Sequence, residues 1–278
     1  MAIITLTTDF GTADHYVAAV KGVLLTLAPK ATLVDVTHHV QLGGLVHASF
    51  ILAQLPSTFP AGTVHLAIVD PTVGTPRAIL AAESAGQFFV APDNGLLTLV
   101  QQRWGLTGLV RIPTIVPTRA ISQTFHGRDI MAPAAAELAN RGKLANVGEL
   151  VSQMELLDIH GAIEADDQCL GEVLYVDQFG NCITNIPEQA VRKMTLHGAG
   201  LTVVAGDTPI GGVVGSYAEV EPGSPLALIG SSERLEIAVN LGSAADKLHL
   251  EPGSLVSLRH TGKKVLARQL EHSAAGAR

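Results

Sequence analysis

The first half of the chain alternates continuous hydrophobic segments with longer segments in which hydrophobic residues recur at helical spacing. The continuous segments predict strands buried on both faces, at residues 2–7, 32–36, 63–69, 78–83 and 87–91. The periodic segments predict helices at residues 14–27, 45–55, 96–104 and 129–140. Because strands of this kind alternate with helices, this half is predicted to form an α/β domain with a mainly parallel sheet.

The second half follows a different pattern, in which short alternating segments are separated by turns rich in Gly, Pro and Asp. Its predicted strands lie at residues 171–176, 182–186, 201–205, 225–229, 234–239 and 255–259. Strands of this length and spacing are typical of a small antiparallel barrel or sandwich. We therefore predict an α/β domain over residues 1–160 and a smaller all-β, barrel-like domain over residues 168–268, with a boundary near the polar stretch 164–168.

Composition and charge exclude several classes of protein. Hydrophobic residues make up 47% of the 278 residues and charged residues 15%, so most of the chain can pack and disorder is not expected. A net charge of -7 without a basic stripe argues against a nucleic-acid partner. The N-terminus has no basic region typical of a signal peptide, and no apolar run reaches the roughly 20 residues that span a bilayer. We predict a soluble, cytoplasmic protein that acts on a small molecule without a membrane.

The two cysteines, Cys169 and Cys182, are too few for a disulfide framework and lack the spacing of metal ligands. No HExxH-type histidine spacing is present, and the adjacent His38 and His39 point to different faces if they lie on a strand. The sequence also lacks a P-loop, a GxGxxG segment and a GxSxG segment. We therefore predict structural thiols and no bound metal.

Polar residues follow two of the predicted strands in the first half. Asp9 follows the first strand, where a carboxylate either accepts hydrogen bonds from a vicinal diol such as a ribose or caps a turn. Asp70 follows the third, and Arg77, seven residues on, pairs with it either within a site or as an ordinary loop ion pair. The carboxyl ends of strands form the ligand crevice of open α/β sheets, so both residues are site candidates.

Two further polar segments flank glycines. His126 precedes Gly127 before a predicted helix, where it has room for a ligand, although a lone histidine is more often structural. Asp129 is expected to pair with Arg128 or to cap that helix. In the second half, Asp177, Phe179 and Asn181 surround a turn at Gly180, which suits a purine as well as an ordinary hairpin. These residues predict a polar crevice with Asp, Arg and His but do not identify the substrate.

Taken together and in this order, the segments resemble one family, the S-adenosylmethionine hydrolases (SAM hydroxide adenosyltransferases), relatives of the SAM-dependent fluorinating and chlorinating enzymes. The similarity runs from about Ile3 to about Arg259. It includes TTDFG at 7–11, DVTH at 35–38, VDPTVG at 69–74, APDNGLL at 91–97, TFHGRDIMAP at 124–133, FGNCITNI at 179–186 and IGSSERLEIAVN at 229–240. The resemblance implies a homotrimer whose sites lie between the N-terminal domain of one subunit and the C-terminal domain of the next.

The resemblance also implies residue roles. Asp70, Arg77 and His126 match the Asp–Arg–His set that distinguishes the hydrolases, and Asp9 matches the residue that holds the ribose hydroxyls. The other residues expected to bind substrate are Asn94, Phe125, Asp177, Phe179, Asn181 and Tyr217, with Ser231, Ser232 and Glu236 at the methionine end. The implied reaction is hydrolysis of S-adenosyl-L-methionine to adenosine and L-methionine, without a cofactor or a metal.

The implied mechanism is an in-line attack of a water or hydroxide on ribose C5′. Free water is a poor nucleophile at neutral pH, because its pKa is about 15.7. Asp70 and His126 are expected to orient the water and to accept its proton. Arg77 is expected to hold Asp70 and to stabilise hydroxide-like character. The sequence leaves open whether water or preformed hydroxide attacks.

The sequence departs from the family pattern at two places. Gly43-Gly44 stands where members carry a larger residue followed by aspartate. Glu233 replaces a glycine that is usual in the family. We expect these changes to affect a wall of the site and the details of methionine binding.

Three other functions remain as alternatives. A halogenase would attack the same carbon with a halide, but Asp70 would repel the anion, and Gly127 stands where halogenating relatives offer a hydroxyl donor. A calcium-dependent nucleoside hydrolase needs several clustered aspartates, whereas this N-terminus has only Asp9 and Asp14. A protein that binds SAM without turnover would leave the catalytic set idle.

Overall fold

The computed structural model describes residues 2–113, 121–165, 167–196 and 200–260 of the chain. It divides into two compact units, Met1–Ile159 and His160–Arg278, here called unit 1 and unit 2. Residues 261–268 of the predicted second domain lie outside the described residues. Among the described residues, no helix is long and apolar enough to cross a membrane.

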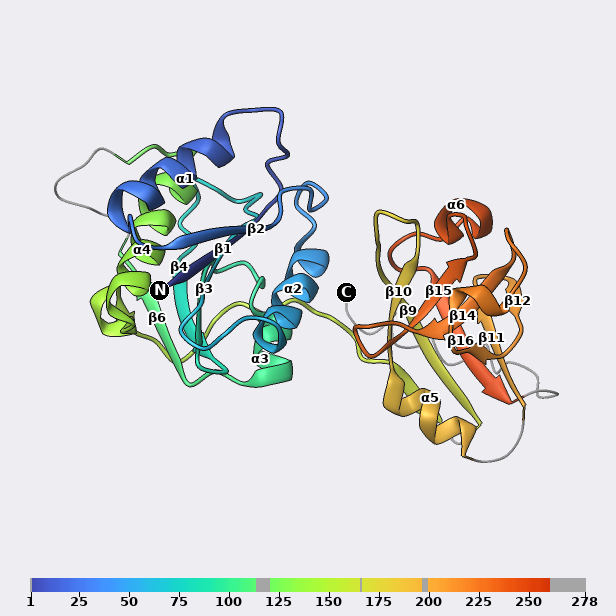
Figure 1. Ribbon diagram of the computed structural model, residues 1–278. Helices are drawn as coiled ribbons and strands as arrows, with labels where there is room; N and C mark the ends of the chain where they lie inside the picture. The colour runs from blue at the N-terminus through green and yellow to red at the C-terminus, as the bar shows by residue number, and fades with distance from the viewer. Residues whose placement is uncertain (1, 114–120, 166, 197–199, 261–278) are drawn as a thin grey trace. The chain divides into compact units, whose positions relative to one another are not determined.

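Unit 1 contains a seven-stranded sheet in the order β2-β1-β3-β5-β4-β6-β7 (Figure 1). The strands are β1 Ile3–Thr8, β2 Thr32–Thr37, β3 Val64–Ile68, β4 Ile79–Ser84, β5 Gln87–Pro92, β6 Gly108–Ile112 and β7 Glu149–Leu150. Strands β2, β1, β3 and β5 pair in parallel, whereas β4, β6 and β7 pair antiparallel. The sheet is therefore mixed, and the prediction of a mainly parallel sheet is wrong in this respect.

A tight turn explains the antiparallel half of the sheet. Only Ala85 and Gly86 separate β4 from β5, and both have positive φ, at 50° and 71°. Two-residue turns with positive φ at both positions join antiparallel strands, because their twist matches that of a hairpin. The hydrophobic pattern reports the two strands but not the turn that reverses the chain.

Four helices cover the sheet of unit 1 in two layers (Figure 1). They are α1 Tyr16–Leu27 and α4 Ala132–Arg141, which pack on each other, and α2 Leu45–Gln54 and α3 Thr98–Trp104, which form the second pair. Helix α4 presents Ala132, Ala134, Ala135 and Ala136 to the core. Short side chains allow the helix to approach the strands closely, which places the segment before α4 near the ends of those strands.

Unit 2 contains a nine-stranded sheet, which curls into a half-barrel around its own core (Figure 1). Its strand order is β12-β11-β16-β9-β10-β15-β14-β13, with β8 paired to β9. The strands are β8 Ile163–Ala165, β9 Gln168–Val176, β10 Cys182–Pro187, β11 Leu201–Ala205, β12 Thr208–Ile210, β13 Val213–Val214, β14 Pro225–Ile229, β15 Arg234–Val239 and β16 Leu255–His260. All described pairs except β13–β14 are antiparallel, as the alternating pattern predicts.

Unit 2 is not all-β, because it also contains the helices α5 Glu188–Thr195 and α6 Ala244–Leu248. Helix α5 buries Ala190, Val191 and Met194 on one side and is too short to give a strong periodic signal. Cys169 and Cys182 are free, buried thiols, and burial raises their pKa values to about 11 and about 12. Such thiols are inert at neutral pH, as expected of structural cysteines.

Candidate active site

The end of β1 places Asp9 at the carboxyl edge of the sheet of unit 1, next to β2 and β3. Asp9 Oδ2 accepts a hydrogen bond from the Gly43 backbone N–H at 3.1 Å. Within the described residues, Asp9 Oδ1 accepts no hydrogen bond. The carboxylate is thus fixed through one oxygen and keeps capacity for a ligand at Oδ1 and at the second lone pair of Oδ2.

Asp70 and Arg77 form an ion pair across the loop between β3 and β4. Arg77 Nε donates to Asp70 Oδ1 at 2.8 Å, and Arg77 Nη2 donates to Asp70 Oδ2. Thr72 Oγ1 also donates to Asp70 Oδ1, at 3.1 Å. Both charged side chains are only 6% exposed, so this is a buried bidentate pair and not a solvated surface pair.

His126 joins this pair through Arg77, whose Nη2 lies 3.1 Å from His126 Nδ1. A guanidinium has no acceptor, so Arg77 donates and Nδ1 accepts. Neutral His126 therefore carries its proton on Nε2. Burial lowers the pKa of His126 below its ordinary value of 6.5, and the charge of Arg77 lowers it further, although Asp70 and Asp129 raise it.

Two glycines allow these segments to come together. Gly74, at φ +85°, lies between Asp70 and Arg77, and a Cβ there would lie 2.8 Å from the Gln123 carbonyl oxygen. A Cβ on Gly127 would lie 2.9 Å from Cγ2 of Ile68, the last residue of β3. The 70–77 loop therefore packs on the segment before His126, and the turn that carries His126 packs on β3.

The structure places the predicted residues Asn94 and Phe125 differently. Asn94 Nδ2 donates to the Val69 carbonyl at 3.0 Å, next to Asp70, while its buried Oδ1 has no hydrogen-bond partner among the described residues. Phe125 is 8% exposed, and its ring packs edge-on against those of Phe10 and Tyr16. Asn94 thus lies beside Asp70, whereas Phe125 belongs to the core of unit 1. Their contact with substrate stays a prediction.

In unit 2, Asp177 organises the turn between β9 and β10. Its Oδ1 accepts the backbone N–H groups of Phe179 at 2.8 Å and Asn181 at 2.9 Å, and its Oδ2 accepts Asn181 Nδ2 at 3.2 Å. Gly180 has φ +81°, and a Cβ there would lie 2.8 Å from Ser243 Cα. The turn is therefore held by three hydrogen bonds to Asp177, and Phe179 is 68% exposed, so its side chain is accessible for stacking on a ligand.

Glu236 lies close to this turn, because it pairs in β15 with Ile183 of β10. Tyr217 Oη donates to Glu236 Oε1 at 2.6 Å. Burial raises the pKa of Glu236, and the charge of Asp177 raises it further, although the hydrogen bond from Tyr217 lowers it. The structure thus gathers the predicted residues Tyr217 and Glu236 beside the turn.

Ser231 and Ser232 follow Gly230, where an added Cβ would collide with the Glu236 carboxylate. The serines are therefore in the turn that backs onto Glu236. Their contact with the methionine end of a substrate stays a prediction.

Comparison with known proteins decides the family. Residues 4–148 match the model of the SAM hydroxide adenosyltransferase N-terminal domain, and residues 171–257 match the model of the SAM hydroxide adenosyltransferase C-terminal domain. The chain belongs to the SAM hydroxide adenosyltransferase family. The resemblance inferred from the motifs is confirmed.

Named relatives of this SAM hydroxide adenosyltransferase family member cover nearly its whole length. The (R)-S-adenosyl-L-methionine hydrolase of Salinispora tropica is 38% identical over 262 residues, 90% of this chain and 95% of the relative. The enzyme of the same name from Thermus thermophilus is 38% identical over 266 residues, 90% of this chain and 96% of the relative. A fluorinase from Actinopolyspora mzabensis is 27% identical over 289 residues, 91% of this chain and 96% of the relative.

A solved structure has the same fold. An uncharacterized conserved protein from Thermotoga maritima superposes with a TM-score of 0.85 at 34% identity, covering 94% of this chain and all (100%) of the other. The two-unit arrangement of strands and helices is therefore shared with that protein.

The two departures from the pattern of the SAM hydroxide adenosyltransferases have visible consequences. Glu233 adopts φ +60°, in the left-handed region where the usual glycine is unstrained. Gly43 has φ +68°, its N–H binds Asp9, and a Cβ there would lie 3.8 Å from Pro71. The Gly43-Gly44 segment thus contacts the loop that carries Asp70 and is tied to Asp9 through its backbone.

Two buried polar residues next to the site were missed in the sequence. His38 is 4% exposed and lies 2.9 Å from the hydroxyl of Thr8, the residue before Asp9. Asp129 is 2% exposed and accepts the Ser122 backbone N–H at 2.9 Å, besides forming the expected pair with Arg128. The DVTH and TFHGRDIMAP motifs contain both residues, but spacing alone gives no sign of burial.

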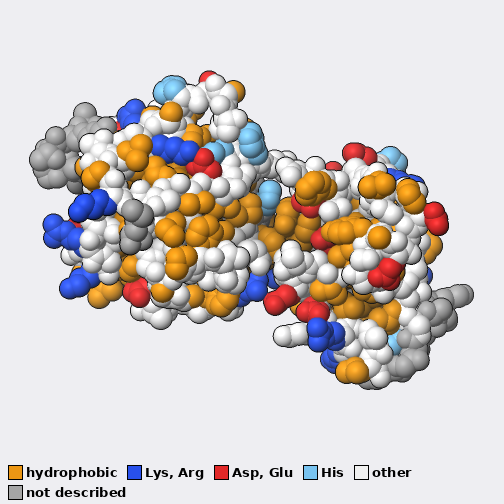
Figure 2. Space-filling view, in the orientation of Figure 1, with side chains coloured by type: hydrophobic (Ala, Val, Ile, Leu, Met, Phe, Trp, Pro, Cys, Tyr) orange, Lys and Arg blue, Asp and Glu red, His pale blue; other side chains and the backbone are white. Residues whose placement is uncertain are grey.

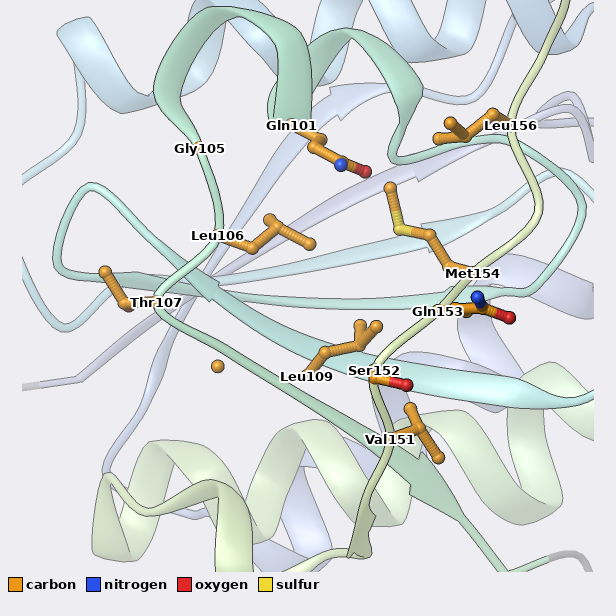
Figure 3. A pocket seen from close by; sticks show the side chains of 11 residues that line it. Gln101, Gly105, Leu106, Thr107, Leu109, Val151, Ser152, Gln153, Met154 and Leu156 are labelled. Carbon is orange, nitrogen blue, oxygen red and sulfur yellow. The ribbon is translucent and has the colours of Figure 1, made fainter.

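A cavity of about 760 Å³ lies elsewhere in unit 1, between α3, β6 and residues 151–156 (Figure 3). Figure 3 shows Gln101, Leu109 and Met154 projecting into it from these three segments. Its lining residues contain no titratable side chain and none of the predicted site residues. In the described part of the chain, no three His, Cys, Asp or Glu side chains are grouped to hold a metal ion.

Proposed function

We propose that this protein hydrolyses S-adenosyl-L-methionine to adenosine and L-methionine. The observation that carries the proposal is the buried Asp70–Arg77–His126 group, in which one guanidinium contacts both of the other side chains. Membership of the SAM hydroxide adenosyltransferase family and the names of the curated relatives support the same reaction.

The chemistry places specific demands on these residues. The C5′–S bond breaks and its electron pair stays on sulfur, so methionine leaves as a neutral thioether. A new O–C5′ bond forms from water, and one proton must be removed. An oxygen nucleophile held in line with C5′ gains several kcal/mol from positioning, because effective molarities reach about 10⁵ M or more.

The hydrogen bond from Arg77 to His126 supports one part for His126 in this step. Since Nδ1 accepts from Arg77, Nε2–H is the group that His126 offers to the nucleophile. His126 therefore orients the water oxygen as a donor, and Arg77 stabilises the negative charge that develops on it. Asp70 is left as the acceptor of the water proton. This differs from the sequence-based hypothesis, in which His126 shares the role of base.

The relatives specify the substrate further than the sequence motifs do. Their names give the (R) configuration at sulfur. The sulfonium is pyramidal, so its two epimers direct the methionine chain differently while the adenosine part is unchanged. We propose that this protein likewise prefers the (R) epimer.

Halogenation is a poorer fit to the site. A halide in place of the water would face the Asp70 carboxylate, which would repel it. A hydroxyl-bearing residue at position 127 would put its Cβ 2.9 Å from Ile68 Cγ2. The close packing of Gly127 on β3 therefore leaves no room for an added halide donor.

We further propose the homotrimer that the resemblance implies. Leu42, Leu150 and Leu241 are 87%, 83% and 88% exposed in the single chain. Hydrophobic side chains are exposed on both units in the view of Figure 2. Association with further copies would bury such side chains.

The test is product analysis with both sulfur epimers, in EDTA and without halide, on the wild type and Asp70→Asn. We expect the wild type to form adenosine and methionine in equal amounts and to turn over the (R) epimer faster. The turnover rate of Asp70→Asn should be lower by about a hundredfold or more. Asp207→Asn, a matched change at an exposed turn, should retain activity.

The other outcomes separate the alternatives. Release of free adenine, or loss of activity with EDTA, indicates a calcium-dependent nucleoside hydrolase. Turnover only after adding chloride or fluoride indicates a halogenase. Bound substrate without any product indicates a binding protein.

A further inference from the structure

His38 is a buried histidine that the proposed reaction does not use. Its Nδ1 lies 2.9 Å from Thr8 Oγ1, and its Nε2 lies 3.0 Å from Asp35 Oδ1. Asp35 Oδ2 in turn accepts from Lys21 Nζ of α1 at 2.6 Å. A line of polar side chains therefore runs from Lys21 of α1 through Asp35 and His38 to Thr8. Thr8 directly precedes Asp9 in the chain.

Thr8 is bonded on both sides of its hydroxyl. The Phe10 backbone N–H donates to Thr8 Oγ1 at 3.3 Å, and His38 Nδ1 lies 2.9 Å from the same oxygen, with the hydroxyl as donor when Nδ1 carries no proton. The Asp35 carboxylate favours a proton on His38 Nε2 by its charge, although the contact is not aligned as a hydrogen bond. His38 thus contacts Thr8 on one side and faces Asp35 on the other.

His38 contacts the chain on both sides of Asp9, once through its backbone and once through its side chain. The His38 carbonyl accepts the Gly11 N–H at 2.7 Å, while the His38 side chain holds Thr8. Asp9 lies between these two attachment points. Gly43, which donates to Asp9, follows His38 in the same segment. The position of the Asp9 carboxylate therefore depends on His38 from both directions along the chain.

A bulge in β2 brings the segment to this place. Leu6 pairs with Asp35, but the next residue, Thr7, pairs with Thr37, so β2 carries one extra residue. Bulges bend a strand, end its pairing and redirect side chains, and they recur beside active sites. Here the bulge lies directly before the contact between Thr8 and His38.

We propose that His38 is a positioning residue that acts through Thr8 and holds Asp9 for recognition of the ribose 2′ and 3′ hydroxyls. The inference rests on the proposed function, because the diol belongs to the proposed substrate. A carboxylate that binds two hydroxyls must keep both oxygens within hydrogen-bond distance at once. A small displacement of Asp9 therefore weakens recognition of the diol without changing the adenine contacts.

The test measures dissociation constants for adenosine and 2′,3′-dideoxyadenosine by calorimetry. Thr8→Val removes the hydroxyl at nearly constant shape. The matched control is Thr5→Val, because Thr5 lies in β1 like Thr8 and its Oγ1 lies 2.8 Å from Nδ1 of His65 in β3. Thr5 and His65 are both fully buried (0% exposed). The control therefore breaks an equivalent Thr–His pair that is not next to Asp9.

We expect Thr8→Val to weaken adenosine binding about fivefold to tenfold and to leave dideoxyadenosine binding nearly unchanged. Thr5→Val should leave the ratio of the two constants as in the wild type. His38→Phe should reproduce the Thr8→Val shift, and the double variant should add nothing further, because both changes break one contact.

Three results overturn the inference: an unchanged ratio in Thr8→Val, an equal loss for both ligands, or a wild type that does not distinguish them. SAM hydrolysis by the same wild-type preparation separates the two proposals. If the wild type hydrolyses SAM but binds adenosine and dideoxyadenosine equally well, the proposed role of His38 is wrong and the proposed hydrolase function is supported.

Discussion

At the residue scale, Arg77 decides the chemistry of its neighbours. It neutralises Asp70 in a buried bidentate pair and fixes the proton of neutral His126 on Nε2. A buried ion pair contributes little to stability by itself, because desolvation offsets the attraction. We interpret the pair by the proposed function, since Arg77 holds a carboxylate and a histidine together at one place.

The lowered pKa of His126 gives a prediction for titration. Its NMR midpoint should lie below 6.5, and Arg77→Gln should move it up while Asp70→Asn moves it down, since these charges act with opposite sign. Because the unfolded chain takes up this proton near pH 6.5, the group's contribution to stability falls as the pH drops from there toward the folded pKa. A wild-type midpoint above 6.5 contradicts the proposed protonation.

Glu233 gives a prediction for stability. Its φ of +60° is unfavourable for a residue with a Cβ, and its backbone is held in that turn by Gly230 and Glu188. We expect Glu233→Gly to raise the free energy of unfolding by about 1 kcal/mol in urea denaturation. Glu233→Ala, which removes the carboxylate but keeps the Cβ, should bring no such gain. An equal gain in stability in both variants would show that the Glu233 carboxylate, and not the backbone conformation, causes the effect.

At the element scale, close contacts between backbone segments bring together the candidate catalytic residues Asp70, Arg77 and His126. The His126 turn is the start of a π-helical turn, Gly127–Met131, that leads into α4. Such irregular turns inside helices are frequent at functional sites. This one lies on β3 because residue 127 has no side chain, and β3 leads directly to Asp70.

The contact between Gly127 and Ile68 can be tested by a double-mutant cycle. Gly127→Ala should destabilise the protein by about 1–3 kcal/mol and lower kcat, because the added methyl overlaps Ile68 and displaces His126. Ile68→Ala removes the overlapping atoms, so the double variant should recover part of kcat relative to Gly127→Ala alone. Strictly additive losses would mean that the glycine is required for another reason.

At the scale of the whole molecule, the predicted site residues are divided between two units with separate cores. Unit 1 carries Asp9, Asp70, Arg77 and His126, and unit 2 carries the turn with Phe179 and the Tyr217–Glu236 pair. Neither unit alone contains both the candidate reacting residues and the candidate purine contacts. The family resemblance predicts that each site takes one half from each of two subunits.

Complementation tests that arrangement. Co-expressed Asp70→Asn and Phe179→Ala chains should each be weakly active alone, yet together regain up to about a quarter of wild-type activity if halves from different subunits pair at random. No recovery in a mixed oligomer contradicts shared sites. Asp70→Asn mixed with a second unit 1 variant, His126→Ala, should show no recovery and serves as the control.

The sequence by itself determined most of the elements, because buried strands and amphipathic helices have different hydrophobic periods. It also determined the family, and it predicted the candidate reacting residues, since motifs such as VDPTVG and TFHGRDIMAP fix residue types at fixed spacing. Only the tertiary structure decided the mixed sheet, because the two-residue turn at Ala85-Gly86 reverses a strand without changing its hydrophobicity. The proton position on His126 and the burial of His38 were likewise decided there. Both depend on partners distant in sequence, 49 residues for Arg77 and His126 and 30 for Thr8 and His38, and local pattern carries no information on such contacts.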